Sequence, residues 1–257
     1  MILFEVRGFV GLVTIDRPDR RNALNGDLCA EFRDVLIAHP ELRAVVITGA
    51  GSAFCAGADL ITRFEPADAS PDSPVVDTFR PAFEALLDAI VDHPAPVIAA
   101  VNGAAMGAGM QLAVACDIRV AGPTARFAIP GGKLGVHLSP RNIWRLAMLI
   151  GQGAARDFLI AGRTAAVEEA VAMGIVQRVA DDPLGAALTI AEEIAVSAPL
   201  TMRGHKRSLN LVAEAQWLSD DARAEIAQLE AEAFGSEDLR EGVAAFAEKR
   251  TPNFQGR

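Results

Sequence analysis

The stretch Asn102–Val120, NGAAMGAGMQLAVACDIRV, follows the apolar run APVIAAV and decides the architecture of the chain. Its glycines Gly103, Gly107 and Gly109 lie between a predicted strand and an apolar helix, where a missing Cβ lets backbone approach a ligand closely. The first N–H groups of such a helix have no partner within it and favour negative charge. The early polar side chain of this helix is Gln111, an amide. The junction therefore predicts a site for an anion, or for a carbonyl oxygen that gains negative charge.

A second junction of the same kind lies upstream. The segment Gly51–Leu60, GSAFCAGADL, follows the strand-like run RAVVITG and again combines small residues with a possible helix start. Two N–H groups from two such junctions could converge on one carbonyl oxygen and form an oxyanion hole. Small-residue turns after strands also serve as plain connections, so both interpretations stay open from these residues alone.

Strand-like and helix-like segments alternate through the first part of the chain. The Val- and Ile-rich runs are ILFEVR, VGLVTID, RAVVITG, APVIAAV and DIRVAG, and helical patterns cover Gly26 to His39, Thr78 to His93 and Gly109 to Ala115. This alternation predicts an α/β fold. Helical periodicity takes over after about residue 140. We expect a core over residues 1–195 and a helical oligomerisation region over 196–257. The Pro-, Asp- and Ser-rich segment Ile61 to Asp77 is expected to be a mobile surface loop.

Composition and charge exclude several classes. The chain has 257 residues, of which 51% are apolar and 22% charged, and its net charge of −9 disfavours a nucleic-acid partner. The start MILFEVRGFVGLVTIDRPDR lacks the features of a signal peptide, and no apolar run reaches the ~18 residues of a membrane span. We therefore expect a cytoplasmic protein with no membrane span.

Other common site chemistries are not supported by the spacing of residues. Cys29, Cys55 and Cys116 are far apart and odd in number, which indicates reduced thiols. The four histidines share no ligand spacing, so no metal is expected. The stretch TGAGSAF has Phe54 where a dinucleotide fingerprint needs its third glycine, so no NAD site is expected.

Five motifs together resemble the enoyl-CoA hydratase/isomerase, or crotonase, superfamily. They are RPDRRNALN, AFCAGADL, NGAAMGAGMQLAVACDIRVAG, ARFAIPGGKLG and FAEKRTPNFQG, in the family's order and spacing from residue 17 to 257. The resemblance implies a crotonase-like spiral of ββα turns with a C-terminal helical trimerisation region, and a homotrimer or a hexamer built as a dimer of trimers. It implies acyl-CoA or enoyl-CoA thioesters as ligands, within fatty-acid or acyl-CoA metabolism. No cofactor is implied, because CoA is part of the ligand.

The resemblance also implies roles for particular residues. The N–H groups of Ala58 and Ala108 are implied to form the oxyanion hole. The residues implied to bind CoA are Arg20, Arg21, Ala23, Leu24, Ala56, Asp59, Leu60, Phe246 and Lys249. Arg20 or Arg21 would lie near the CoA phosphates, whereas Phe246 and Lys249 would reach CoA from a neighbouring subunit. A local basic cluster could hold those phosphates on an acidic protein, although a solvated basic surface is the alternative interpretation.

The chain departs from the family where the acid and base groups are expected. Hydratases of the family activate water with two glutamates, whose positions are Gln111 and Gly131 here. An amide can orient water but is not a useful base, and glycine has no side chain. Some isomerases place a carboxylate at the position of Ser139, and a serine without a paired base accepts protons poorly. The chain thus resembles a paralogue that lacks the usual catalytic glutamates.

Several titratable candidates and two functions remain. His137, in GVHLSP, is a candidate base, although a loop histidine that faces solvent is the alternative. Asp68, Asp72 and Asp77 could also turn inward. We favour an acyl-CoA binding protein, nominally an enoyl-CoA hydratase of the lyase class, that has lost hydratase chemistry. The alternative is an active hydratase, isomerase or other CoA-thioester enzyme that uses an unusual base such as His137.

Overall fold

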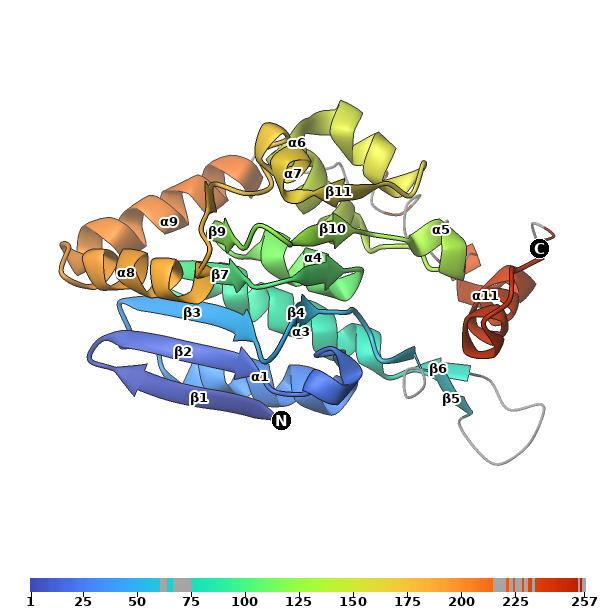
Figure 1. Cartoon of the computed structure of the whole chain (residues 1–257), viewed down its shortest axis with the longest axis horizontal. Helices are drawn as coiled ribbons and strands as arrows, with labels where there is room; N and C mark the ends of the chain where they lie inside the picture. Colours follow the sequence, from blue (N-terminus) through green and yellow to red (C-terminus); the bar gives the residue numbers. More distant parts are fainter. Residues whose placement is uncertain are drawn as a thin grey trace.

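The computed structural model describes residues 1–60, 64–66, 75–214 and 234–253, together with positions 221, 224, 228, 231, 232 and 255. For 64–66 and 75–77 only the backbone is described. The predicted α/β class and the ββα spiral are confirmed, because three successive turns of the chain each add one strand to each of two sheets before a helix follows (Figure 1).

The larger sheet has six strands in the order β1-β2-β3-β7-β9-β12. All neighbours are parallel except β1 and β2, which form an antiparallel hairpin. The strands are β1 (Ile2–Arg7), β2 (Val10–Ile15), β3 (Ala44–Gly49), β7 (Val97–Val101), β9 (Ile118–Ala121) and β12 (Arg178–Val179). The first five coincide with the strand-like runs that the sequence predicts.

The smaller sheet was not predicted. Its order is β11-β10-β8-β4, with β4, β8 and β10 parallel and β11 antiparallel at one edge. The strands are β4 (Ala53–Cys55), β8 (Ala104–Met106), β10 (Arg126–Ala128) and β11 (Thr164–Ala166). Strands of three residues are too short for an alternating pattern to be recognised.

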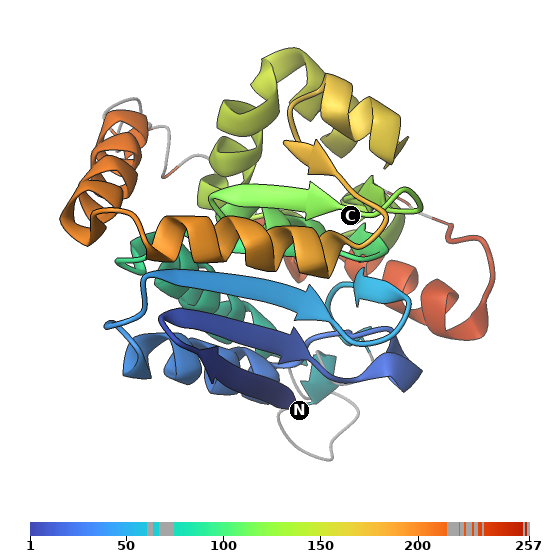
Figure 2. The ribbon, with the colours of Figure 1, turned by 60° about the vertical axis from the view of Figure 1, so that its left-hand side comes forward.

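Helices cover both faces of the larger sheet, and this explains its continuous apolar runs. Val45 and Ile47 of β3 face the main core beneath α1 (Gly26–Ala38) and α3 (Phe79–Asp92). The alternate residues Ala44 and Val46 pack against Ile190 and its neighbours on α8 (Pro183–Ala195), which crosses the opposite face (Figure 2). A parallel strand buried on both faces reads as uninterrupted apolar sequence.

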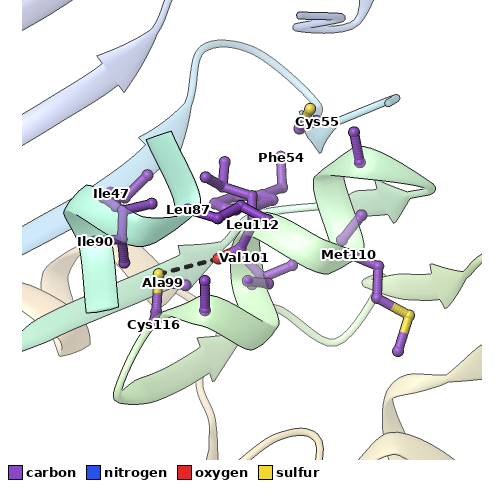
Figure 3. Packing of buried hydrophobic residues seen from close by; sticks show 14 of the residues in the cluster. Ile47, Phe54, Cys55, Leu87, Ile90, Ala99, Val101, Met110, Leu112 and Cys116 are labelled. Atoms are coloured by element: carbon purple, nitrogen blue, oxygen red, sulfur yellow. Dashed lines mark hydrogen bonds between the residues drawn. The ribbon is translucent and has the colours of Figure 1, made fainter. Parts of the chain in front are cut away.

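The helix predicted after the glycines is α4 (Ala108–Ala115), and it lies inside the main core. Figure 3 shows Leu112 of α4 among Leu87 and Ile90 of α3. The Cys116 thiol donates to the Leu112 carbonyl at 3.3 Å, and burial raises the pKa values of Cys55 and Cys116 to about 12. These cysteines are packing residues rather than nucleophiles.

Helices dominate the chain beyond residue 140, as predicted. The helix α6 (Pro140–Leu159) is interrupted at Gly151, where φ is 77° and ψ is 160°, which accounts for the two separate helical patterns in its sequence. The further helices are α5 (Gly131–Leu134), α7 (Val167–Ala172), α9 (Pro199–Glu214) and α11 (Glu237–Glu248), and the 3-10 helix η1 covers Pro18–Arg20.

The loop predicted over Ile61 to Asp77 is partly wrong. Two short strands, β5 (Phe64–Pro66) and β6 (Val75–Asp77), pair antiparallel within it. Three paired residues flanked by Pro, Asp and Ser leave no strand pattern in the sequence. Asp68 and Asp72, and the side chain of Asp77, lie outside the described part of the chain.

The two described helices of the C-terminal region lie at opposite ends of the molecule. α9 extends from the end of α8, whereas α11 lies beside α5 (Figures 1 and 2). Leu209 and Val212 of α9 are 69% and 62% exposed in the single chain. The domain boundary near residue 195 stays a prediction. Within the described residues no single helix is long and apolar enough to cross a membrane, although the bent pair α8 and α9 meets that test together.

Asn22 fastens the segment before α1 to the turn between β3 and β4. It has a left-handed backbone, with φ at 59°, and no exposed surface. Its Nδ2 donates to the carbonyls of Ala50 at 2.8 Å and Ala53 at 2.7 Å, and its Oδ1 accepts from the N–H of Arg17 at 3.0 Å. Asparagine tolerates this conformation better than most residues, so one side chain supports a tight turn and satisfies three backbone groups.

We therefore expect Asn22→Ala to destabilise the fold. Each buried polar group left without a partner costs roughly 1–3 kcal/mol, and alanine is also less favourable in the left-handed region. Urea unfolding would measure the change, with Asp19→Ala on the exposed surface of the same turn as the control. Equal midpoints for Asn22→Ala and the wild type would contradict this role.

Candidate functional site

The two junctions predicted from the sequence meet in space. Gly57 has φ at 111°, and a Cβ placed on it would lie 3.0 Å from the Met106 carbonyl oxygen and 3.7 Å from the Ala108 nitrogen. A Cβ on Gly109 would lie 2.1 Å from the Cys55 carbonyl oxygen, which no side chain tolerates. The glycines thus allow the end of β4 to touch the start of α4 backbone to backbone.

Two N–H groups at this meeting point have no backbone partner within the part of the chain that the structure describes. Ala58 forms a parallel bridge with Leu24, in which the Leu24 N–H donates to the Gly57 carbonyl at 2.8 Å and the Asp59 N–H donates to the Leu24 carbonyl at 2.7 Å. Within the described residues the Ala58 N–H donates to no backbone carbonyl. Ala108 is the first residue of α4, so its N–H has no partner in the helix.

Both residues border a cavity of about 360 Å³. Its walls come from the Ala56–Leu60 segment, from α3 and α4, and from the loop around α5. The predicted site residues that line it are Arg21, Ala56, Ala58, Leu60, Ala108, Gln111, Gly131, His137, Ser139 and Phe246. Apolar side chains such as Phe79, Phe83 and Ile129 complete the walls, as is typical of small-molecule sites.

The other predicted residues lie outside the walls of the cavity. They are Arg20, Ala23, Leu24, Asp59 and Lys249. Ala23, Leu24 and Asp59 belong to the support of the Ala58 segment, and Arg20 is exposed. Leu24 is fully buried, and Asp59 forms an ion pair with Arg17 at 3.2 Å. Arg17 also donates to the Ala23 carbonyl at 2.8 Å, so a charge pair holds the two segments together.

Phe246 reaches the cavity from α11 of its own subunit. The helix lies close to α5, since a Cβ on Gly242 would be 2.5 Å from the Leu134 carbonyl oxygen. Lys249 ends α11 with a left-handed backbone, with φ at 54°. The contribution of Phe246 and Lys249 to a neighbouring subunit stays a prediction.

The two positions that correspond to the family's glutamates both face the cavity. The Gln111 Nε2 donates to the Gly107 carbonyl at 3.3 Å, so the amide is held against the start of its own helix. Gly131 does not have a positive φ, but a Cβ placed on it would lie 2.6 Å from the Val136 carbonyl oxygen. Any side chain at Gly131 therefore requires the following loop to move.

The structure adds a carboxylate that sequence reasoning missed. Glu84 of α3 lines the cavity, and its Oε1 accepts a hydrogen bond from the Asn142 Nδ2 at 2.8 Å. Ser139 lies close enough to the same carboxylate to lower its pKa. The role expected for Ser139 stays a prediction. Glu84 follows Phe83 at the edge of an amphipathic helix, so its sequence context is that of an ordinary polar flank.

Arg145 and Asp88 hold Asn142 in place beside this carboxylate. The Arg145 guanidinium donates to the Asn142 Oδ1 at 3.1 Å and to the Asp88 Oδ1 at 2.7 Å. Asn142 is 4% exposed and Arg145 is 9% exposed, so both are fixed by packing. Burial raises the pKa of Glu84 above its ordinary value, while the Ser139 hydrogen bond and the charge of Arg145 oppose that rise. The carboxylate is positioned, and its ionised form is disfavoured.

His137 lies in the same wall with a different environment. It is half-buried, and its buried Nδ1 has no hydrogen-bond partner among the described residues. His137 lines the cavity, and its role as a base stays a prediction. Over the same described residues no cluster of three His, Cys, Asp or Glu side chains could hold a metal ion.

Solved structures with this arrangement define the class of fold. A structure of enoyl-CoA hydratase/isomerase from Pseudoalteromonas atlantica T6c superimposes with a TM-score of 0.84 at 33% identity, over 99% of both chains. A carnitinyl-CoA hydratase from Mycobacterium avium gives 0.81 at 34% identity, over 100% of this chain and 98% of that one. The spiral with its helical C-terminal region is thus the crotonase fold.

The chain belongs to the enoyl-CoA hydratase/isomerase family, whose sequence model matches residues 5–257. A probable enoyl-CoA hydratase of Mycobacterium tuberculosis, echA6, is 39% identical over 251 residues, which cover 95% of each protein. The putative enoyl-CoA hydratase/isomerase YngF of Bacillus subtilis is 35% identical over 266 residues, covering 99% of this chain and 98% of that protein. The expected family membership is confirmed.

The raised pKa of Glu84 gives a stability prediction. Because the folded protein binds this proton more tightly than the unfolded chain, the contribution of Glu84 to stability falls as pH rises from the ordinary glutamate pKa through the raised one. Glu84→Gln keeps an acceptor for Asn142 and removes the buried charge. We expect its thermal midpoint to exceed that of the wild type at pH 7.

The thermal midpoint of Glu84→Gln at acidic pH provides the control. Below about pH 4, where glutamate is protonated in the folded and unfolded states, the two proteins should have nearly equal midpoints. A Glu84→Gln midpoint below the wild-type value at pH 7 would mean that the carboxylate stabilises the fold.

Proposed function

We propose that the protein binds acyl-CoA or enoyl-CoA thioesters, and that the N–H groups of Ala58 and Ala108 form an oxyanion hole for the thioester carbonyl. The observation that supports this most is the contact between Gly57 and the start of α4. It brings to one cavity two N–H groups that have no backbone partner within the described ranges. Donors fixed before the ligand arrives stabilise negative charge on oxygen without reorganisation.

The walls of the cavity suit the parts of such a ligand. Apolar side chains, among them Phe79, Phe83 and Ile129, offer a surface for an acyl group. Arg21 borders the same cavity and is exposed, so it is placed to meet phosphate at the protein surface. The relatives named above are described as hydratases or isomerases of CoA thioesters, in agreement with this ligand class.

Ordinary hydratase chemistry is not part of the proposal. The two positions of the family's glutamates are occupied by Gln111 and Gly131 in this chain. Neither an amide nor a glycine can act as an acid or a base. We favour a thioester-binding role in fatty-acid or acyl-CoA metabolism, in a cytoplasmic homotrimer or hexamer. The second candidate is an enzyme with a different base, which the presence of Glu84 and His137 in the cavity wall supports.

Recognition of the thioester carbonyl can be tested with two ligands that differ only in the presence of the carbonyl oxygen. We expect butyryl-CoA to bind on the order of 10-fold more tightly than the butyl thioether of CoA, because two N–H groups contribute about 0.5–1.5 kcal/mol each. Titration calorimetry would measure both affinities. Arg21→Ala should weaken both ligands by a similar factor, since it acts on the shared phosphates.

Equal affinities for the thioester and the thioether would contradict the oxyanion hole while leaving CoA binding intact. Ala58→Pro removes one of the two donors and should reduce the preference for the thioester. Circular dichroism of this variant checks that the Ala58 segment still folds.

Hydration of crotonyl-CoA should be far slower than ordinary enzymatic turnover of about 1 to 10³ s⁻¹. Each missing acid or base typically removes ~10²- to 10⁴-fold in rate. Gln111→Glu should raise the rate, whereas adding Gly131→Glu should not help, because its Cβ meets the Val136 carbonyl. Absorbance of the enoyl thioester follows the reaction. Wild-type turnover within the ordinary range would contradict the binding role.

A further inference from the structure

The wall of the cavity that α3 forms contains a positioned carboxylate, Glu84. Arg145 forms its ion pair with Asp88, which also pairs with Arg141 at 3.4 Å, and Asn142 could be satisfied by a neutral acceptor. Burial raises the pKa of Glu84, so its carboxylate is costly to the fold and correspondingly more basic than an exposed glutamate. A costly group held in place at a ligand cavity is typical of acid–base chemistry.

We propose that Glu84 is the acid–base group of this cavity, and that it exchanges a proton with the acyl carbon next to the thioester carbonyl. This inference rests on the proposed function, because the carbonyl must lie in the oxyanion hole for that C–H bond to become acidic. It replaces the missing glutamates with a carboxylate from a different helix, α3, held by the first turn of α6.

The step balances without any further reactant. The Cα–H bond breaks and its proton passes to an oxygen of Glu84. The electron pair forms a C–C double bond to the carbonyl carbon, and the carbonyl π pair moves to oxygen as an enolate beside the N–H groups of Ala58 and Ala108. Return of a proton from the Glu84 carboxyl restores the thioester. Exchange of that carboxyl proton with water makes the cycle visible in D₂O.

The surroundings of Glu84 favour it over His137 as the base. Asn142 holds the carboxylate with a hydrogen bond of 2.8 Å, and the nearby Ser139 is itself fixed as the cap of α6. No described residue holds the Nδ1 of His137 in place. The charged groups that act on Glu84 are Arg80 and Asp88 of α3 and Arg145 of α6. A general base needs a fixed position as well as a suitable pKa.

The test is deuterium exchange into butyryl-CoA in D₂O, followed by proton NMR of the α-CH₂ group. Wild type should exchange these hydrogens well above the rate in buffer. Glu84→Gln should lower the rate by ~10²-fold or more, while calorimetry shows butyryl-CoA binding within about threefold of wild type. Asp92→Asn removes a carboxylate from the exposed end of the same helix and should leave the rate unchanged.

A pH profile separates a base from a merely structural residue. The wild-type rate should rise with pH as one group ionises above the ordinary glutamate range, and Glu84→Asp should restore part of the rate that Glu84→Gln loses. Exchange by Glu84→Gln at the wild-type rate, or loss of exchange in His137→Gln alone, would overturn the inference.

Failure of the two proposals gives different results. Butyryl-CoA that binds wild type without exchanging its α-hydrogens would overturn the role of Glu84 and leave thioester binding intact. Butyryl-CoA that does not bind at all would overturn both.

Discussion

The close contact of two backbone segments is the constraint on which the rest of the molecule depends. Gly57 and Gly109 allow the end of β4 to touch the start of α4, at distances that a Cβ at either position would not allow. The same contact leaves the N–H groups of Ala58 and Ala108 without a backbone partner among the described residues, so the packing requirement and the proposed site have one origin.

Two sets of contacts support the walls around this contact. The Ala58 segment is fastened by the bridge to Leu24 and by the ion pair between Arg17 and Asp59. The wall that carries Glu84 is held by the hydrogen bond from Asn142, in the first turn of α6, to α3. The cavity thus combines the N–H groups of Ala58 and Ala108 with the carboxyl group of Glu84, whose pKa is raised. This combination suits a site that first binds a carbonyl and then acts on the neighbouring carbon.

Much of this could be predicted from local sequence. The five long strands are visible because each is a short apolar run ended by Gly, Pro or Asp, and the glycine junctions mark where backbone must come close. The smaller sheet could not be predicted, because three-residue strands such as β8 have no readable period. Glu84 was missed for a different reason: its role depends on Ser139 and Asn142, more than fifty residues away, and nothing local to α3 indicates that contact.

The most direct test of the central claim is isotope-edited infrared spectroscopy of butyryl-CoA labelled with ¹³C at the thioester carbonyl. Two converging N–H groups polarise the carbonyl, so its stretch should move to lower frequency in the bound state than in water. A proline at position 58 should remove part of that shift. A bound carbonyl that absorbs at the frequency found in water, or above it, would contradict the claim that the two glycine junctions form an oxyanion hole.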